Sequence, residues 1–175
     1  SWADRNDFWQ WNQAYIIALG NNDVFVCGHP VGSAADIHPE DPESNPDTFF
    51  GNIGRIVSKL KSIEKDARIF LVSMQRRGEE TADPIIRAIA EEMKNMCGLF
   101  SFTYLIDMTN DGPVYDEEMR KTFGLGFHPN AMGYYSYALM VGNYIDYLIR
   151  KNPRDFFEVP FIGKGFRNKD FNIKS

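Results

Sequence analysis

The stretch that decides the fold is AYIIALGNND, residues 14–23. Residues 15–19 form a continuous apolar run, which is typical of a strand buried on both faces of a parallel sheet. Residues 20–23 would then be the loop at the carboxyl end of that strand, and α/β sheets bind their ligands at such loops. The stretch therefore predicts an α/β fold with a site at this loop.

Two further apolar runs, residues 68–74 and 102–107, predict a second and a third buried strand. Helical patterns lie between and after the strands, so the order is strand, helix, strand, helix, strand, helix. This alternation predicts parallel strands joined by right-handed crossovers in one domain, with residues 151–175 as a carboxyl-terminal extension. The expected architecture is three-layer α/β/α. Three strands are few for a chain of 175 residues.

Three helices are expected from caps and apolar periodicity. Asn45 and Pro46 form a helix-start signal, and apolar residues follow at three- and four-residue steps as far as residue 63. Asp83-Pro84 repeats the signal before an apolar stripe that ends at Gly98. The last helix is expected over residues 129–150. Residues 24–44, rich in Gly, Pro and Asp, predict a long irregular loop that serves as a lid or pocket wall.

Composition restricts the class of protein. The chain of 175 residues is long enough to bury a core, and its 43% hydrophobic and 14% aromatic residues agree with a packed globular protein. Its net charge of -5 argues against a nucleic-acid partner, although residues 150–175 carry seven basic and three acidic residues and form a basic tail. No apolar run approaches the roughly 20 residues of a membrane span, and no signal peptide is visible. The compartment stays undetermined.

The two cysteines and two of the histidines give only weak signals. Cys27 and Cys97 are far apart, which indicates neither a zinc cluster nor a disulfide scaffold and leaves a single bridge open. His29, Asp36 and His38 could be metal ligands, but their spacing matches no strong template. We therefore predict no metal and no other cofactor.

The stretch GLGFHPNAMGY, residues 124–134, carries the third histidine. His128 directly precedes Pro129, which favours the first turn of a helix, so its imidazole is expected at the mouth of the last helix. A histidine there can take a proton from a hydroxyl nucleophile and return it to a leaving group.

The loop after the first strand could supply donors to the same edge of the sheet. The side-chain amide of Asn22 and the backbone amide of Gly20 could converge on a developing oxyanion, worth about 3 kcal/mol per donor in acyl-transfer sites. The alternative is a turn in which Asn22 and Asp23 hydrogen-bond to nearby backbone.

These two stretches together resemble the SGNH hydrolases, also called GDSL esterases. Residues 17–23 look like the Gly-x-Asn-Asp block that follows an apolar strand in that family, and His128-Pro129-Asn130 followed by Gly133-Tyr134 is similar to the last block. The resemblance covers roughly residues 11–150. It implies a flavodoxin-like parallel sheet, His128 as general base, Asn22 as oxyanion donor, and Gly20 and Asp23 in the substrate-binding loop.

The chain departs from the family pattern at the residue that should orient the histidine. The family has an aspartate three residues before the histidine, and Leu125 stands there. Asp107, Asp111, Asp116 or a backbone carbonyl could replace it, or the site could work as a dyad.

The second departure is the missing nucleophile. The family's Gly-Asp-Ser motif is absent, and neither Ser1 nor Ser33 stands where that serine should be. We therefore expect the amino-terminal strands of the fold to lie outside this chain, and the edge of the first strand to be covered by a second chain or an amino-terminal fragment.

The resemblance implies a serine hydrolase that cleaves a carboxylic ester, namely an acyl or acetyl ester, with a small molecule or a carbohydrate as substrate. Trp2, Trp9 and Trp11 could form an aromatic rim for a sugar ring. The alternative is a binding or structural module that keeps the fold without catalysis. A third hypothesis is a metal-dependent hydrolase that uses His29 and His38.

Overall fold

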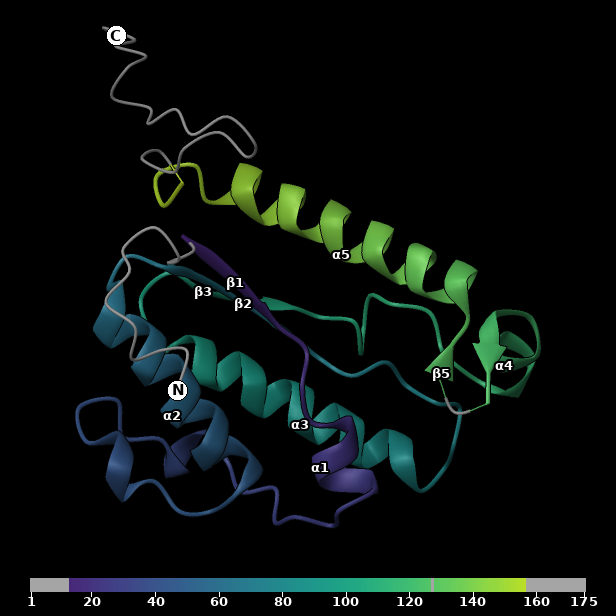
Figure 1. The fold of residues 1–175 in the computed structure, drawn as a ribbon, viewed down its shortest axis with the longest axis horizontal. Coiled ribbons are helices and arrows are strands. Elements are labelled where there is room, and N and C mark those ends of the chain that lie inside the picture. The colour runs from purple at the N-terminus through teal and green to yellow at the C-terminus, as the bar shows by residue number, and fades with distance from the viewer. Residues whose placement is uncertain (1–12, 127, 157–175) are drawn as a thin grey trace, which may run out of the picture.

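A computed structural model describes residues 13–126 and 128–156 (Figure 1). Its three main strands are β1 (Ala14–Ile17), β2 (Arg68–Val72) and β3 (Thr103–Ile106). Two very short strands, β4 (Gly124–Leu125) and β5 (His128–Pro129), form a separate hairpin. The helices are α1 (Asn21–Phe25), α2 (Phe49–Ile63), α3 (Ala82–Cys97), α4 (Glu117–Phe123) and α5 (Ala131–Lys151), with 3-10 turns at Ala34–Asp36 and Pro42–Ser44.

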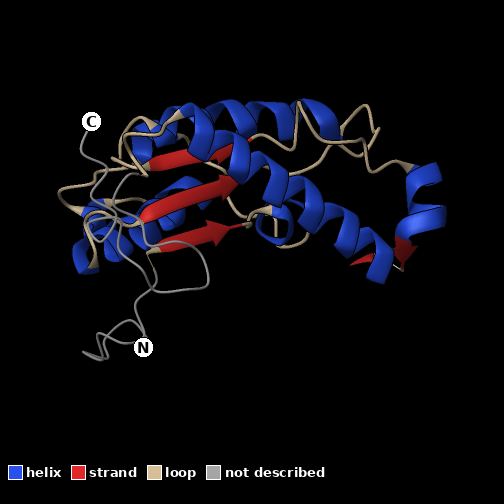
Figure 2. Cartoon of the chain, turned by 90° about the horizontal axis from the view of Figure 1, so that it is seen from above, coloured by secondary structure: helices blue, strands red, loops and turns tan. Residues whose placement is uncertain are grey.

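The main sheet is parallel and has the order β1-β2-β3, which confirms the predicted α/β class. Ile17 lies opposite Leu71 in the β1–β2 register, and Leu71 lies opposite Leu105 in the β2–β3 register. All three strands point the same way, so their carboxyl ends share one edge of the sheet (Figure 2). The three predicted strands exist, and each is shorter than its apolar run.

Alternate residues of β2 face two different layers of helices. Ile69 and Leu71 belong to the core cluster formed with α2 and α3, whereas Phe70 and Val72 pack in the cluster that contains Val141 of α5. Figure 1 accordingly shows α5 above the sheet and α2 and α3 below it. Four of the five residues of β2 are buried, which explains the uninterrupted apolar run in the sequence.

The start of α2 differs from the prediction. The helix begins at Phe49, and the hydroxyl of Thr48 caps it by accepting a hydrogen bond from the Gly51 amide at 3.0 Å. Asn45, the predicted cap, is buried instead, and its side chain accepts from the His38 amide and donates to the Gly51 carbonyl. Asn45 therefore joins the preceding loop to the first turn of the helix, instead of capping it.

The start of α5 was also predicted too early. His128 and Pro129 lie in β5, and the helix begins at Ala131 behind Asn130, whose side chain accepts from the Gly133 amide at 2.9 Å. Asn130 also donates to the Thr122 carbonyl. The helix begins after Asn130 rather than at Pro129, because the Asn130 side chain satisfies an amide of the first turn that would otherwise have no partner.

The long loop of residues 24–44 packs on helices rather than forming a lid over the carboxyl edge. Ala34 and Ile37 are buried in the α2–α3 core cluster, and the Ala34 amide donates to the Glu92 carboxylate of α3 at 2.8 Å. The sequence did not predict α1, α4 or the β4–β5 hairpin, because each is too short to show a periodic pattern.

Both cysteines of the described region are free thiols, so the bridge left open by the sequence is not formed. Cys27 is exposed, whereas burial raises the pKa of Cys97 to about 12.

This difference predicts selective alkylation. Because the thiolate is the reactive form, iodoacetamide at mildly alkaline pH should modify Cys27 and leave Cys97 largely unmodified in the folded chain. Peptide mass spectrometry before and after unfolding in urea measures this, and equal labelling of both thiols in the folded chain would contradict the placement of Cys97.

Candidate functional site

The loop after β1 is held in shape by Gly20. Its φ of +116° is a conformation that side-chain-bearing residues rarely adopt, and a Cβ at this position would lie 2.7 Å from Cζ of Phe49. Gly20 therefore lets the chain leave β1 and pass closely over the start of α2.

The residues after Gly20 form the short helix α1 rather than the predicted open loop. Asn22 is exposed, and its carbonyl accepts hydrogen bonds from the amides of Val26 and Cys27. No described residue hydrogen-bonds to the side chain of Asn22, whereas Asp23 is half-buried. Among the described residues, the side-chain amide of Asn22 is therefore unpaired and exposed.

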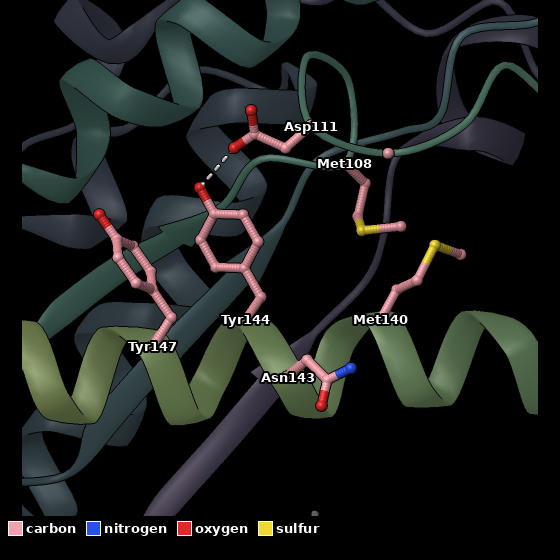
Figure 3. Close-up of a pocket in the computed structure, with 7 residues that line it drawn as sticks. Met108, Asp111, Met140, Asn143, Tyr144 and Tyr147 are labelled. Atoms are coloured by element: carbon pink, nitrogen blue, oxygen red, sulfur yellow. Dashed lines mark hydrogen bonds between the residues drawn. The ribbon is translucent and has the colours of Figure 1, made fainter.

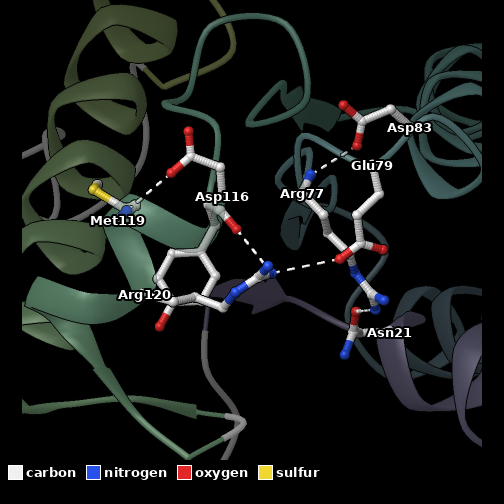
Figure 4. Close-up of polar contacts among 8 residues, drawn as sticks. Asn21, Arg77, Glu79, Asp83, Asp116, Met119 and Arg120 are labelled. Carbon is white, nitrogen blue, oxygen red and sulfur yellow. Dashed lines mark hydrogen bonds and ion pairs between the residues drawn. The ribbon is translucent and has the colours of Figure 1, made fainter.

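Arg77, in the loop after β2, joins that loop to α1. Its Nη2 donates to Oδ1 of Asn21 at 2.7 Å, and its guanidinium lies 4.1 Å from the ring centroid of Phe25. Its own backbone amide donates to Asp83 at 2.7 Å, so the loop is also tied to α3 (Figure 4). These contacts of Arg77 bring the loops after β1 and β2 together, as the parallel topology predicts. The sequence pattern gives no sign of them.

The loops after β2 and β3 are joined by a buried pair of hydroxyls. Thr109 donates from Oγ1 to the Met74 carbonyl at 2.6 Å, and its backbone amide donates to Oγ of Ser73 at 3.0 Å. Arg76 then donates to the Thr109 carbonyl at 2.9 Å. Ser73 and Thr109 are both almost fully buried, so neither hydroxyl is open to a substrate.

An ion pair continues this set of contacts to α4. Glu79, in the loop after β2, lies 3.5 Å from Nη1 of Arg120, and that same nitrogen donates to the Tyr115 carbonyl at 3.2 Å (Figure 4). The segment that leads into the His128 hairpin is therefore fastened to the same loop that holds Asn21.

His128 is exposed on the hairpin, opposite Leu125 in the register. No described residue forms a hydrogen bond or ion pair with its imidazole. Figure 1 places β5 and α1 beyond the carboxyl ends of the strands, but apart from each other. The structure thus brings His128 and Asn22 to one edge of the sheet without contact between them.

The three carboxylates proposed to orient His128 have other partners. Asp107 accepts from both the backbone and side-chain amides of Asn110, Asp111 accepts from the Tyr144 hydroxyl, and Asp116 caps α4 by accepting from the Met119 amide. Within the described part of the chain, none of the three forms a hydrogen bond or ion pair with His128.

The remaining candidates divide between described and undescribed parts of the chain. Ser33 caps the Ala34–Asp36 turn. His29 and His38 are exposed, and within residues 13–126 and 128–156 no group of three or more His, Cys, Asp or Glu side chains could hold a metal ion. The predicted aromatic rim, Trp2, Trp9 and Trp11, lies outside the described residues, as does most of the basic tail.

A cleft of about 440 Å³ lies between the loop after β3 and α5 (Figure 3). Its lining combines two thioethers, two phenol rings, an amide and a carboxylate, from Met108, Asp111, Gly112, Met140, Asn143, Tyr144 and Tyr147. Neither His128 nor Asn22 lines it. Of the lining residues, only Asp111 was a candidate site residue from the sequence.

Comparison with protein-family models, curated proteins and solved structures finds no match for this chain. The SGNH resemblance therefore rests on the two short motifs alone. Among the described helices, none is long and apolar enough to cross a membrane.

The conformation of Gly20 gives a direct test of this local geometry. Gly20→Ala should lower the free energy of unfolding by about 2 kcal/mol, because the new methyl group meets Phe49 at an unfavourable φ. Gly142→Ala is the matched control, since a Cβ at Gly142 in α5 meets no atom within 4 Å and should stabilise the chain by up to about 1 kcal/mol. Urea titration followed by circular dichroism measures both, and equal stability of the Gly20 variant and the parent chain would refute this geometry.

Proposed function

We propose that this chain supplies the histidine- and asparagine-bearing part of a serine ester hydrolase of the SGNH type. The nucleophilic serine comes from a polypeptide segment outside these residues. The substrate is a carboxylic ester, namely an acyl or acetyl ester, with small molecules and carbohydrates as the candidate classes.

One observation carries this proposal: Asn22 in α1 and His128 in the β4–β5 hairpin, the two residues of the resembling motifs, are both exposed, and their elements lie beyond the carboxyl ends of the parallel strands (Figure 1). Ligands of open α/β sheets bind outside this edge. The contacts from Asn21 through Arg77 and from Glu79 to Arg120 fasten both segments to the loop after β2. That loop therefore links the two segments.

In the proposed reaction, the imidazole of His128 takes the proton of the serine hydroxyl as that oxygen attacks the ester carbonyl. The side-chain amide of Asn22 donates to the oxyanion that forms. His128 then returns the proton to the leaving alcohol, and the resulting acyl-serine is hydrolysed by water with the same proton transfers.

In the hydrolase that contains this chain and its serine, His128→Ala should lower kcat/KM for a chromogenic acyl ester by about a thousandfold or more, because the general base is lost. His29→Ala and His38→Ala are matched controls, since both histidines are exposed and lie outside this site. Unchanged turnover by the His128 variant would refute the assignment. Loss of turnover on adding a chelator, together with loss in the His29 or His38 variant, would favour the metal-dependent alternative.

The second candidate is a binding or structural module without catalysis. It is favoured by Leu125, which stands opposite His128 in the hairpin, and by the other partners of Asp107, Asp111 and Asp116. A complete protein that contains no Gly-Asp-Ser segment after a strand, and that hydrolyses no acyl ester, would favour the module.

We also propose that a further strand pairs with β1, as the full SGNH fold would require. In the described region β1 is hydrogen-bonded to β2 alone in the sheet order. Ile16, which is level with Phe70 on the α5 side, is 55% exposed, and Leu19 beyond the strand is 47% exposed. An apolar edge of this kind favours pairing with another segment.

This pairing makes the isolated chain prone to associate. Light scattering should find species heavier than the monomer, and Ile16→Lys should reduce their mass because a charge on an edge strand opposes pairing. Ile85→Lys is the control, since Ile85 is 43% exposed and belongs to α3, which lies on the other side of the sheet from α5 (Figure 1). A monodisperse monomer of the unmodified chain would contradict the proposal.

A further inference from the structure

The cleft between the loop after β3 and α5 has the composition of a small-molecule site. Apolar walls with a few polar groups are the usual lining of such sites, and its volume of about 440 Å³ is within their range. Met108 and Met140 project toward each other from the two sides, and Tyr144 extends from α5 toward Asp111 (Figure 3). Thioethers adapt their shape to a ligand, whereas the phenol rings offer flat faces.

The tight loop at one side of the cleft fixes the position of Asp111. Its backbone amide donates to the Asp107 carbonyl at 3.0 Å. A Cβ on the neighbouring Gly112 would lie 2.5 Å from the carbonyl oxygen of Met108, so this turn needs glycine. The carboxylate is thus presented by a constrained turn.

The Asp111 carboxylate has no cationic partner among the described residues. Its Oδ2 accepts a hydrogen bond from the Tyr144 hydroxyl at 2.9 Å, which leaves its other oxygen open. Burial raises the pKa of Tyr144 to about 12, and the hydrogen bond to Asp111 and the charge of Asp107 add to this rise. Tyr144 therefore remains a donor at neutral pH, and two negative charges, Asp107 and Asp111, act at this end of the cleft.

A cation already lies on one of the rings. Nζ of Lys151 is 5.5 Å from the ring centroid of Tyr147, within the range of a cation–π contact. Tyr144 packs against Tyr147 edge to face, with centroids 5.8 Å apart. Aromatic rings beside a carboxylate are the combination that recognises organic ammonium groups.

We propose that this cleft binds a small organic ammonium ion, with its charged nitrogen at Asp111 and its apolar part against Tyr144 and the methionines. The proposal does not depend on the hydrolase function, because neither His128 nor Asn22 takes part. It assigns a binding role to Asp111 in place of the orienting role considered from the sequence.

The test uses benzylammonium, with benzyl alcohol as a neutral probe of the same ring, in an NMR titration of the unmodified chain. Benzylammonium should produce saturable amide shifts in residues 108–112 and 140–147, and bind severalfold more tightly than benzyl alcohol. Its affinity should fall as salt is added, because an exposed charge pair is screened. Equal affinity for the two probes, or no saturable shift in these residues, would overturn the proposal.

Asp111→Asn keeps an acceptor for the Tyr144 hydroxyl while removing the charge, and should weaken benzylammonium binding by about fivefold. Glu91→Gln removes one charge from an exposed side chain of α3, which pairs with Lys94 and does not line the cleft, and should leave the affinity unchanged. An equal effect of the two substitutions would mean that general electrostatics, rather than this cleft, attracts the probe. The comparison of probes on the unmodified chain decides the question even if a variant is unstable.

Discussion

The burial of β2 on both faces is the constraint on which the rest of the structure depends. Its residues alternate between two helical layers, with Ile69 and Leu71 toward α2 and α3 and Phe70 and Val72 toward α5. Because β1 and β3 pair with β2 in parallel, every connection must cross over the sheet and every following loop emerges at the same edge. The loops after β1, β2 and β3 therefore meet at one edge.

The loop after β2 contacts several of the other segments at that edge. Within a few residues it holds α1 through Arg77, α3 through the Asp83 carboxylate, and α4 through Glu79. Ser73 joins it to the loop after β3 through the buried bond with Thr109. Exposed polar contacts contribute little stability one by one, so their main effect here is to fix where the segments lie.

The two helical layers cover the sheet unequally. Below it, α2 and α3 bury Ile17 and the inward side of β2, whereas above it α5 leaves Ile16 of β1 exposed. Along α5 the exposed apolar residues include Met132, Tyr135, Leu139 and Tyr147, a spacing that keeps them on one side of the helix.

The sequence by itself determined the three parallel strands, the helices between them and the edge that carries Asn22 and His128, because strand burial and helix periodicity are local patterns. It placed the starts of α2 and α5 too early, because Thr48 and Asn130, which lie later in the chain than the predicted starts, cap the first turns by accepting from the Gly51 and Gly133 amides. Only the tertiary structure decided that Arg77 reaches Asn21, that Asp111 bonds to Tyr144 and that the two cysteines stay apart. The two hydrogen bonds join residues more than thirty positions apart in the chain, and the cysteines are separated by a similar stretch, and no local periodicity encodes such relations.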